Sequence, residues 1–219
     1  MADWYEAFSG HVNPIFTKED FQKYKKGVIE DLKRYRKYLP KGARILDLGC
    51  GLGTQAVPLS ALGYKVTGID IDKRVAEAAR QNARNFGGDI RIIKGDVFDL
   101  DKMFYKDSFD ACISSGVLEH FKKGNIKKIV KLQLELAPQV VASMPVKTEK
   151  TMKAYGFTEK TALNNVSHYG IYRNFWSENE WINGVLKGFN VVNHFIAPAS
   201  QVVGGFDMIH VIIKRKVRS

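Results

Sequence analysis

The chain has 219 residues, of which 45% are hydrophobic and 26% charged, enough to bury the core of one large α/β domain or two small ones. Its formal net charge of +11 is compatible with an anionic partner but does not establish one. No run approaches the ~20 apolar residues of a membrane span, and the N-terminus lacks the pattern of a signal peptide, so we expect a cytoplasmic protein.

The first half of the chain alternates helical and strand patterns. Apolar residues three and four apart predict amphipathic helices, and short apolar runs bounded by glycine or proline predict buried strands. In chain order, the predicted elements are a helix at 18–38, a strand at 44–48, a helix to about 62, a strand at 65–69, a helix from 72 to about 86 and a strand at 89–94. Asp72 is expected to cap the third of these helices.

The second half ends in strands that no helix separates. Its predicted elements are a strand at 109–114, a helix at 122–136, a strand at 139–143, a helix at 177–186 that begins with a capping box, and strands at 189–196 and 208–214. The stretch 146–176 has no clean period. Lysines of the helix at 122–136 fall at helical spacing, which favours a solvated outer face over a nucleic-acid footprint.

Five alternations of strand and helix, followed by a strand pair, predict an α/β fold. We expect a doubly wound, mostly parallel seven-stranded sheet with helices on both faces and a C-terminal antiparallel strand pair. The chain has no evident linker, so residues 1–219 are predicted to form a single domain, with an N-terminal helix or lid at 1–39 and the sheet at 40–219. Ligands should bind at the carboxyl ends of the strands.

A glycine-rich loop, Gly49 to Gly53, follows the first predicted strand. Glycine permits a tight turn and a close approach of ligand to backbone, although a glycine triplet alone is a weak signal. Aspartates stand at the ends of three successive strands: Asp47, Asp70 and Asp96. Asp70 lies about the ~20 residues downstream that are expected of an acid binding ribose hydroxyls. A dinucleotide-binding loop is the alternative, but it would have a third glycine where this chain has Thr54.

At these residues the chain resembles class I S-adenosylmethionine-dependent methyltransferases. The stretches similar to that family's motifs are Ile45-Leu46-Asp47-Leu48-Gly49-Cys50-Gly51-Leu52-Gly53-Thr54, Gly68-Ile69-Asp70-Ile71-Asp72, Gly95-Asp96-Val97, Phe109-Asp110 with Val117-Leu118-Glu119-His120-Phe121, and Arg173 to Phe189. The resemblance extends from about residue 40 to the end. It implies a Rossmann-like core at 40–219, S-adenosylmethionine as cofactor and S-adenosylhomocysteine as product. Residues 1–38 and 146–170 match none of the family's motifs, and 146–176 is a possible insertion at the acceptor site.

The resemblance also implies roles for individual residues. Asp70 would bind both ribose hydroxyls and Asp96 the adenine amino group, with Ile71 and Val97 packing on the ring. The methionine part of the cofactor would lie against the first loop and the turn after the fourth strand: Asp47, Gly49, Cys50, Gly51, Gly53, Ser114, Ser115 and Gly116.

His120 is the candidate catalytic base, because it follows the fourth strand and its ordinary pKa lies near neutrality. A structural histidine is the alternative. Further candidates for the acceptor site are Tyr5, Glu119, His168, Tyr169 and Arg173. For Arg173 a structural ion pair is an equal alternative. The N-terminal aromatic residues are as compatible with core packing as with a lid.

The sequence lacks motifs that are typical of several classes of methyltransferase, and this limits the class of methyl acceptor. It contains neither the Pro-Pro motif typical of enzymes that methylate base amines, nor a Pro-Cys nucleophile, nor a paired-glutamate loop. We therefore expect transfer to an O, N or C nucleophile of a small molecule. An RNA methyltransferase that uses the basic surface and a non-catalytic S-adenosylmethionine-binding protein remain alternatives. No metal site is expected, since the two cysteines, Cys50 and Cys112, lack metal-binding spacing.

Overall fold

The computed structural model describes residues 4–10, 12–155, 171–198 and 205–216. Its centre is one sheet in the order β3-β2-β1-β4-β5-β7-β6. The strands are β1 (Arg44–Leu48), β2 (Lys65–Asp70), β3 (Ile90–Lys94), β4 (Ala111–Ser115), β5 (Gln139–Pro145), β6 (Asn190–Pro198) and β7 (Asp207–Lys214). Strands β1 to β5 run parallel, whereas β7 is antiparallel to both of its neighbours. The predicted fold class is confirmed.

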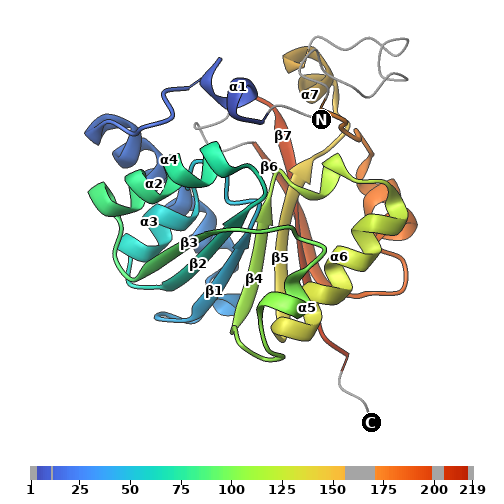
Figure 1. Ribbon diagram of the computed structural model, residues 1–219. Coiled ribbons are helices and arrows are strands. Elements are labelled where there is room, and N and C mark those ends of the chain that lie inside the picture. Colours follow the sequence, from blue (N-terminus) through green and yellow to red (C-terminus); the bar gives the residue numbers. More distant parts are fainter. Residues whose placement is uncertain (1–3, 11, 156–170, 199–204, 217–219) are drawn as a thin grey trace.

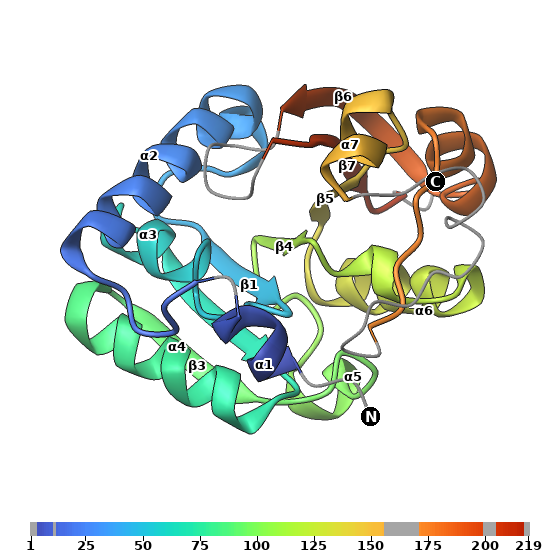
Figure 2. The ribbon, with the colours of Figure 1, turned by 90° about the horizontal axis from the view of Figure 1, so that it is seen from above.

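Helices cover both faces of the sheet (Figures 1 and 2). One face carries α2 (Lys18–Tyr35), α3 (Ala56–Ala61) and α4 (Lys73–Phe86), and the other carries α5 (Leu100–Met103), α6 (Lys123–Leu136) and the π-helix η3 (Glu180–Val185). The shorter helices are α1 (Trp4–Ser9), η1 (Arg36–Tyr38), η2 (Leu118–His120) and α7 (Glu149–Ala154). Within the described residues, no helix is both long and apolar enough to cross a membrane.

Local capping explains where two long helices begin. The Thr17 hydroxyl accepts from the Asp20 backbone N–H at 3.1 Å, and the Asp20 carboxylate accepts from the Thr17 N–H at 3.0 Å, which closes a capping box at α2. Asp72 accepts from the backbone N–H groups of Arg74 and Val75 at the start of α4, as predicted. These caps fix two helices that flank the carboxyl edge of the sheet.

Each face of the sheet has its own hydrophobic core. On the α6 side, Leu46, Leu48 and Val140 pack with Ile126, Ile129 and Trp181. On the α2 side, Ile45, Val66 and Ile113 pack with Val28 and Tyr35. A smaller cluster joins Phe16 and Tyr24, whose ring centroids are 4.8 Å apart, so Phe16 belongs to the core and not to a lid.

The structure differs from the predicted elements mainly in short helices and at element ends, where tertiary contacts determine the backbone conformation. The N-terminal helix α1 and the short helices α5 and α7 were not predicted, and α7 lies inside the stretch that has no clean period. Strand β5 extends beyond the predicted 139–143 to Pro145. Proline is tolerated there because its missing N–H falls at the last residue of the strand, where no later strand hydrogen bond is lost. The capping box at Ser177 and Glu180 is present, but the helix that follows is a π-helix.

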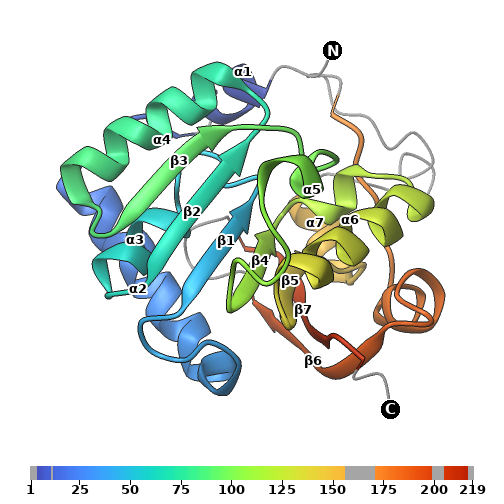
Figure 3. The ribbon, with the colours of Figure 1, turned by 60° about the horizontal axis from the view of Figure 1, so that its bottom comes forward.

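The carboxyl ends of β1, β2, β3, β4 and β5 meet at one edge of the sheet, and α1 lies over that edge (Figures 1 and 3). Helix α1 therefore lies next to the loops that carry the sequence motifs.

Candidate functional site

The loop after β1 forms one wall of the candidate site. Gly49, Gly51 and Gly53 have φ angles of +56°, +55° and +87°, which residues other than glycine rarely adopt. A Cβ on Gly49 would lie 2.8 Å from Val117 Cγ2, and a Cβ on Gly53 would lie 2.7 Å from Val57 Cγ2. Glycine is therefore required at both positions for the turn from β1 towards α3.

The three predicted aspartates lie at the ends of β1, β2 and β3. Asp70 is 8% exposed and accepts the Gly51 and Asp72 backbone N–H groups at 3.0 Å each. Each of its oxygens keeps a lone pair for a further donor. Burial raises the pKa of Asp70, and the N–H groups that it accepts oppose this shift. Asp96 Oδ1 accepts the Phe98 N–H at 2.9 Å.

Asp47 is buried beside Asp70, with 2% of its surface exposed. Its Oδ2 makes no hydrogen bond in the structure. Burial, followed by the charge of Asp70, raises the pKa of Asp47 to about 8, although the Ala56 N–H acts in the opposite direction. A buried carboxylate oxygen without a donor is costly, so this position favours a cationic group beside it.

Three other residues of the predicted cofactor site differ in where their side chains lie. Ile71 is 52% exposed at the carboxyl edge, so its side chain is available to pack on a ring. Val97, in contrast, is buried in the core on the α6 side. Cys50 is also buried, its N–H donates to the Ile69 carbonyl at 2.9 Å, and burial raises the pKa of its thiol well above the ordinary range. Cys50 thus serves the packing of the loop against β2.

The turn after β4 carries the next group of predicted residues. The Ser143 hydroxyl donates to Ser115 Oγ at 2.9 Å, and the Gly116 N–H donates to the Ser143 carbonyl at 2.9 Å. The Ser114 hydroxyl is buried without a hydrogen-bond partner. Gly116 has a φ of +68°, which turns the chain into η2. This turn presents His120 to the same edge of the sheet as the aspartates.

The predicted base, His120, has a side chain only 7% exposed. Its Nδ1 lies 2.7 Å from the Tyr172 carbonyl oxygen, which accepts the ring N–H. In the neutral ring, Nε2 is then the unprotonated nitrogen, and it lies 3.7 Å from Glu119 Oε1. Burial lowers the pKa of His120, Glu119 raises it and Arg173 lowers it. The ring is therefore neutral near pH 7, with Nε2 able to accept a proton.

Asn174 holds this arrangement together. It is 2% exposed, its backbone N–H donates to the Glu119 carbonyl at 2.7 Å, and its side-chain Nδ2 donates to the carbonyls of Glu119 at 2.9 Å and Phe121 at 2.7 Å. The Tyr172 hydroxyl donates to Asn174 Oδ1 at 2.6 Å. Asn174 was not predicted from the sequence, because no local pattern marks a residue whose side-chain amide donates to carbonyls more than fifty positions away.

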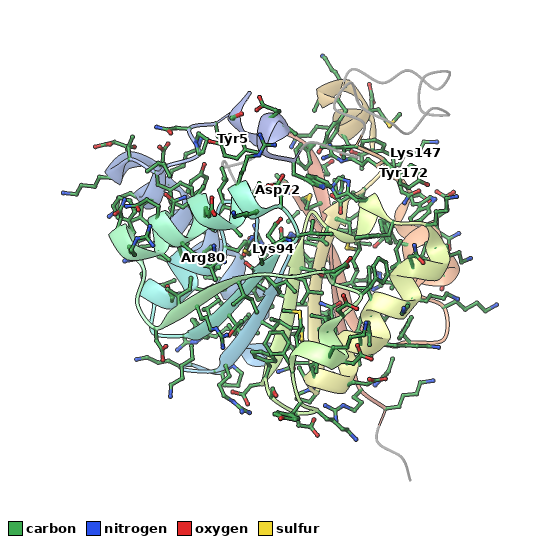
Figure 4. All side chains as sticks on the ribbon, in the orientation of Figure 1. Tyr5, Asp72, Arg80, Lys94, Lys147 and Tyr172 are labelled. Atoms are coloured by element: carbon green, nitrogen blue, oxygen red, sulfur yellow. The ribbon has the colours of Figure 1, made fainter. Side chains whose placement is uncertain are left out.

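The N-terminal helix reaches the site through Trp4. The Trp4 ring meets the His120 ring edge-on, with centroids 4.8 Å apart. Tyr5 instead packs under the Arg74 guanidinium at 4.8 Å, above Asp72 in the view of Figure 4. Within the described residues, Trp4 is thus the N-terminal aromatic residue that contacts the candidate base, while Tyr5 contacts α4.

Arg173 lies beside His120 on the acceptor side of the site. Its guanidinium is 4.9 Å from the centroid of the Tyr155 ring, and its Nε is buried without a hydrogen-bond partner. Two other candidates, His168 and Tyr169, lie outside the described residues. No cluster of three or more histidine, cysteine, aspartate or glutamate side chains able to hold a metal ion occurs in the part of the chain that the structure describes.

Comparisons with known proteins agree with this geometry. Residues 45–136 match a protein-family model described as a methyltransferase domain. The chain is thus similar to this family over that stretch, which is less than half of its length. The match covers β1 to α6, which contain the glycine loop, the three aspartates and His120.

Individual relatives extend the similarity. A ubiquinone biosynthesis O-methyltransferase of Methylocella silvestris is 41% identical over 95 residues, 42% of this chain and 36% of that protein. A ribosomal protein L11 methyltransferase of Aquifex aeolicus is 31% identical over 93 residues, again 42% of this chain and 36% of that protein. The chain thus spans about a third of the length of these curated relatives.

The structure of a magnesium protoporphyrin IX methyltransferase from Synechocystis, with bound S-adenosylhomocysteine, superimposes with a TM-score of 0.66 at 18% identity. It covers 98% of this chain and 94% of that chain. At this identity the likeness establishes the fold, which extends well beyond the residues of the sequence matches.

Proposed function

We propose that the domain transfers a methyl group from S-adenosylmethionine to an O, N or C nucleophile of a small molecule, with S-adenosylhomocysteine as product. The observation that carries this proposal is the placement of three aspartates around one glycine loop at the carboxyl edge of the sheet. The methyltransferase match and the relatives named above support it. A cytoplasmic setting and a single domain over 1–219 belong to the same proposal.

The residues at this edge fit the cofactor. The unpartnered Oδ2 of Asp47 is suited to a cationic ammonium group, and the remaining lone pairs of Asp70 are suited to two ribose hydroxyls. Asp96 would accept from the adenine amino group, and the exposed Ile71 would pack on the ring. Gly51 and the other loop glycines, with the backbone of Ser114 to Gly116, would bind the methionine part.

His120 is the proposed general base. Because Nδ1 donates to the Tyr172 carbonyl, Nε2 is the nitrogen that can take a proton from the acceptor. Glu119, 3.7 Å away, stabilises the imidazolium that forms. When bound, S-adenosylmethionine supplies a methyl group on a positively charged sulfur, which leaves as a neutral thioether. The bond from carbon to the acceptor atom forms as the carbon–sulfur bond breaks, and the acceptor proton passes to Nε2 and then to solvent.

A small-molecule acceptor is favoured by aromatic side chains that contact His120 and Arg173. Trp4 contacts His120, and Tyr155 packs with Phe175 and Phe206 at centroid distances of 4.9 and 5.0 Å. The lysines of α6, by comparison, occupy the exposed face of a helix whose apolar face is buried in the core. The α6 lysines are therefore compatible with solubility alone.

Incubation of the protein with methyl-labelled S-adenosylmethionine tests this function, with fractionated small metabolites and total RNA offered separately. We expect label in one or more small molecules, and none when Asp70→Ala replaces the wild type. Label in RNA alone would support the RNA alternative. Tight binding of the cofactor without transfer to either fraction would support a non-catalytic binding protein.

A further inference from the structure

Two charged side chains on the acceptor side have buried polar atoms without partners. Arg173 Nε and Glu119 Oε2 both have no hydrogen bond in the structure, and Glu119 is 1% exposed. Unpaired buried atoms of charged groups destabilise a folded protein, so proteins rarely keep them unless a ligand or water completes the site. Their position beside His120 points to the acceptor.

The surroundings of Arg173 are aromatic on one side. Its guanidinium lies over the Tyr155 ring at 4.9 Å, and Tyr155 is flanked by Phe175 and Phe206. Within the described part of the chain, no carboxylate lies within ion-pair distance of Arg173. A planar guanidinium with an unpartnered N–H next to aromatic rings is suited to a carboxylate attached to a flat apolar body.

The charges of Glu119 and Arg173 both influence the pKa values of His120 and Tyr155. The charge of Glu119 raises the pKa of both His120 and Tyr155, and the charge of Arg173 lowers both. The two charges therefore lie near the same two side chains, His120 and Tyr155. An acceptor that bridged this region would place one end at the base and the other at the guanidinium.

We propose that the acceptor is a flat aromatic acid that carries its nucleophile as a hydroxyl group, with the carboxylate bound by Arg173 and the hydroxyl directed to His120. This inference rests on the proposed function and names the class of its substrate. Tyr155 would pack against the ring of the acceptor, and Glu119 Oε2 would accept from the hydroxyl before the proton moves to His120. A neutral acceptor would leave the Arg173 guanidinium unpaired.

Binding to the protein saturated with S-adenosylhomocysteine tests the inference. The probes are 4-hydroxybenzoate and its neutral counterpart 4-hydroxybenzyl alcohol, titrated at millimolar concentrations and followed by NMR. We expect the acid to bind at least about tenfold more tightly than the alcohol in the wild type. Arg173→Gln should remove this preference, and Arg173→Lys, which keeps the charge but loses the planar fork, should retain only part of it.

Lys147→Gln is the matched control. Lys147 is exposed at the same end of the molecule as Tyr172, and its change removes one positive charge without altering Arg173 (Figure 4). This variant should keep the preference for the acid. If Arg173→Gln does not fold, as judged by its affinity for S-adenosylhomocysteine, the test is the preference for the acid in Arg173→Lys compared with the wild type.

Equal binding of acid and alcohol, or no binding of either probe, would overturn the inference while S-adenosylhomocysteine still binds. Retention of the preference for the acid in Arg173→Gln would overturn it as well. Failure of S-adenosylhomocysteine itself to bind the wild type would instead contradict the proposed function. The two failures are thereby distinguished.

Discussion

The two halves of the site are built in different ways. The half formed by β3, β2, β1 and β4 uses loops that follow directly on strands, and its candidate residues fall within one continuous stretch, 47–116. The part of the site around η2, which follows β4 and contacts β5, uses side chains from distant parts of the chain. There Trp4, His120, Tyr155 and Arg173 converge through contacts that join α1, η2, α7 and the segment before η3.

In one part of the site, backbone conformation determines the positions of the functional side chains. In the other part, networks of side-chain contacts determine them. In the first half, positive φ angles at glycine and strand register place Asp47 and Asp70. In the second half, His120 is oriented by a carbonyl from residue 172 and by Asn174. We therefore expect substitutions in the first half to change cofactor binding, and substitutions in the second half to change turnover.

The largest effect is expected at Asp70. Asp70→Ala removes the acceptor of two loop N–H groups and of the proposed ribose hydroxyls, so affinity for S-adenosylmethionine should fall by about 100-fold or more. Calorimetry measures this loss, and Asp101→Ala, an exposed aspartate on α5, is the control. Wild-type affinity in the Asp70 variant would remove Asp70 from the cofactor site.

At His120 the effect should fall on turnover alone. His120→Asn should lower kcat by about 100-fold, the lower end of the range for general-base catalysis, with cofactor affinity unchanged. His194→Asn changes a histidine on β6 that pairs with Glu178 at 3.2 Å, and it should leave both quantities unchanged. If kcat of the His120 variant equals that of the wild type, His120 has a packing role against Trp4.

A pH effect is expected at Asp47. Burial raises the pKa of Asp47 to about 8, so its carboxyl is mostly protonated at pH 7 in the free protein, whereas a bound ammonium group favours the ionised form. Cofactor binding should release a proton, and affinity should rise by up to about tenfold per pH unit between pH 6 and 7.5, below the range in which a free α-amino group titrates.

Calorimetry in buffers of different ionisation enthalpy measures this proton release. In Asp47→Asn the release and the pH dependence of affinity should both disappear. A proton release that persists unchanged in Asp47→Asn would assign it to another group and would leave Asp47 without a role in binding the cation.

The smallest effect on turnover is expected at Asn174, which positions His120 without touching the acceptor. Asn174→Ala leaves the carbonyls of Glu119 and Phe121 without these donors, so stability should fall by about 1–3 kcal/mol. We expect kcat to fall about fivefold and the acid limb of its pH profile to shift. Asn183→Ala, at an exposed residue of η3, is the control. Lower stability with an unchanged pH profile would restrict Asn174 to a structural role.

The sequence predicts the first half of the site better than the second, for physical reasons. Gly49, Gly53 and Asp72 satisfy local requirements of backbone angle and capping, which a short stretch of sequence reveals. The contacts of Asn174 with Glu119 and of Trp4 with His120 span more than fifty residues, and no local sequence pattern indicates these partners. Val97 shows that a motif position can also belong to the core.

The central claim is that the glycine loop and its three aspartates form a site for S-adenosylmethionine. Calorimetric titration of the wild-type protein with S-adenosylmethionine and, separately, with NAD tests it most directly, because a glycine-rich loop after the first strand is compatible with either adenosine-containing ligand. We predict saturable 1:1 binding of S-adenosylmethionine and no binding of NAD. Binding of NAD without binding of S-adenosylmethionine would contradict the claim.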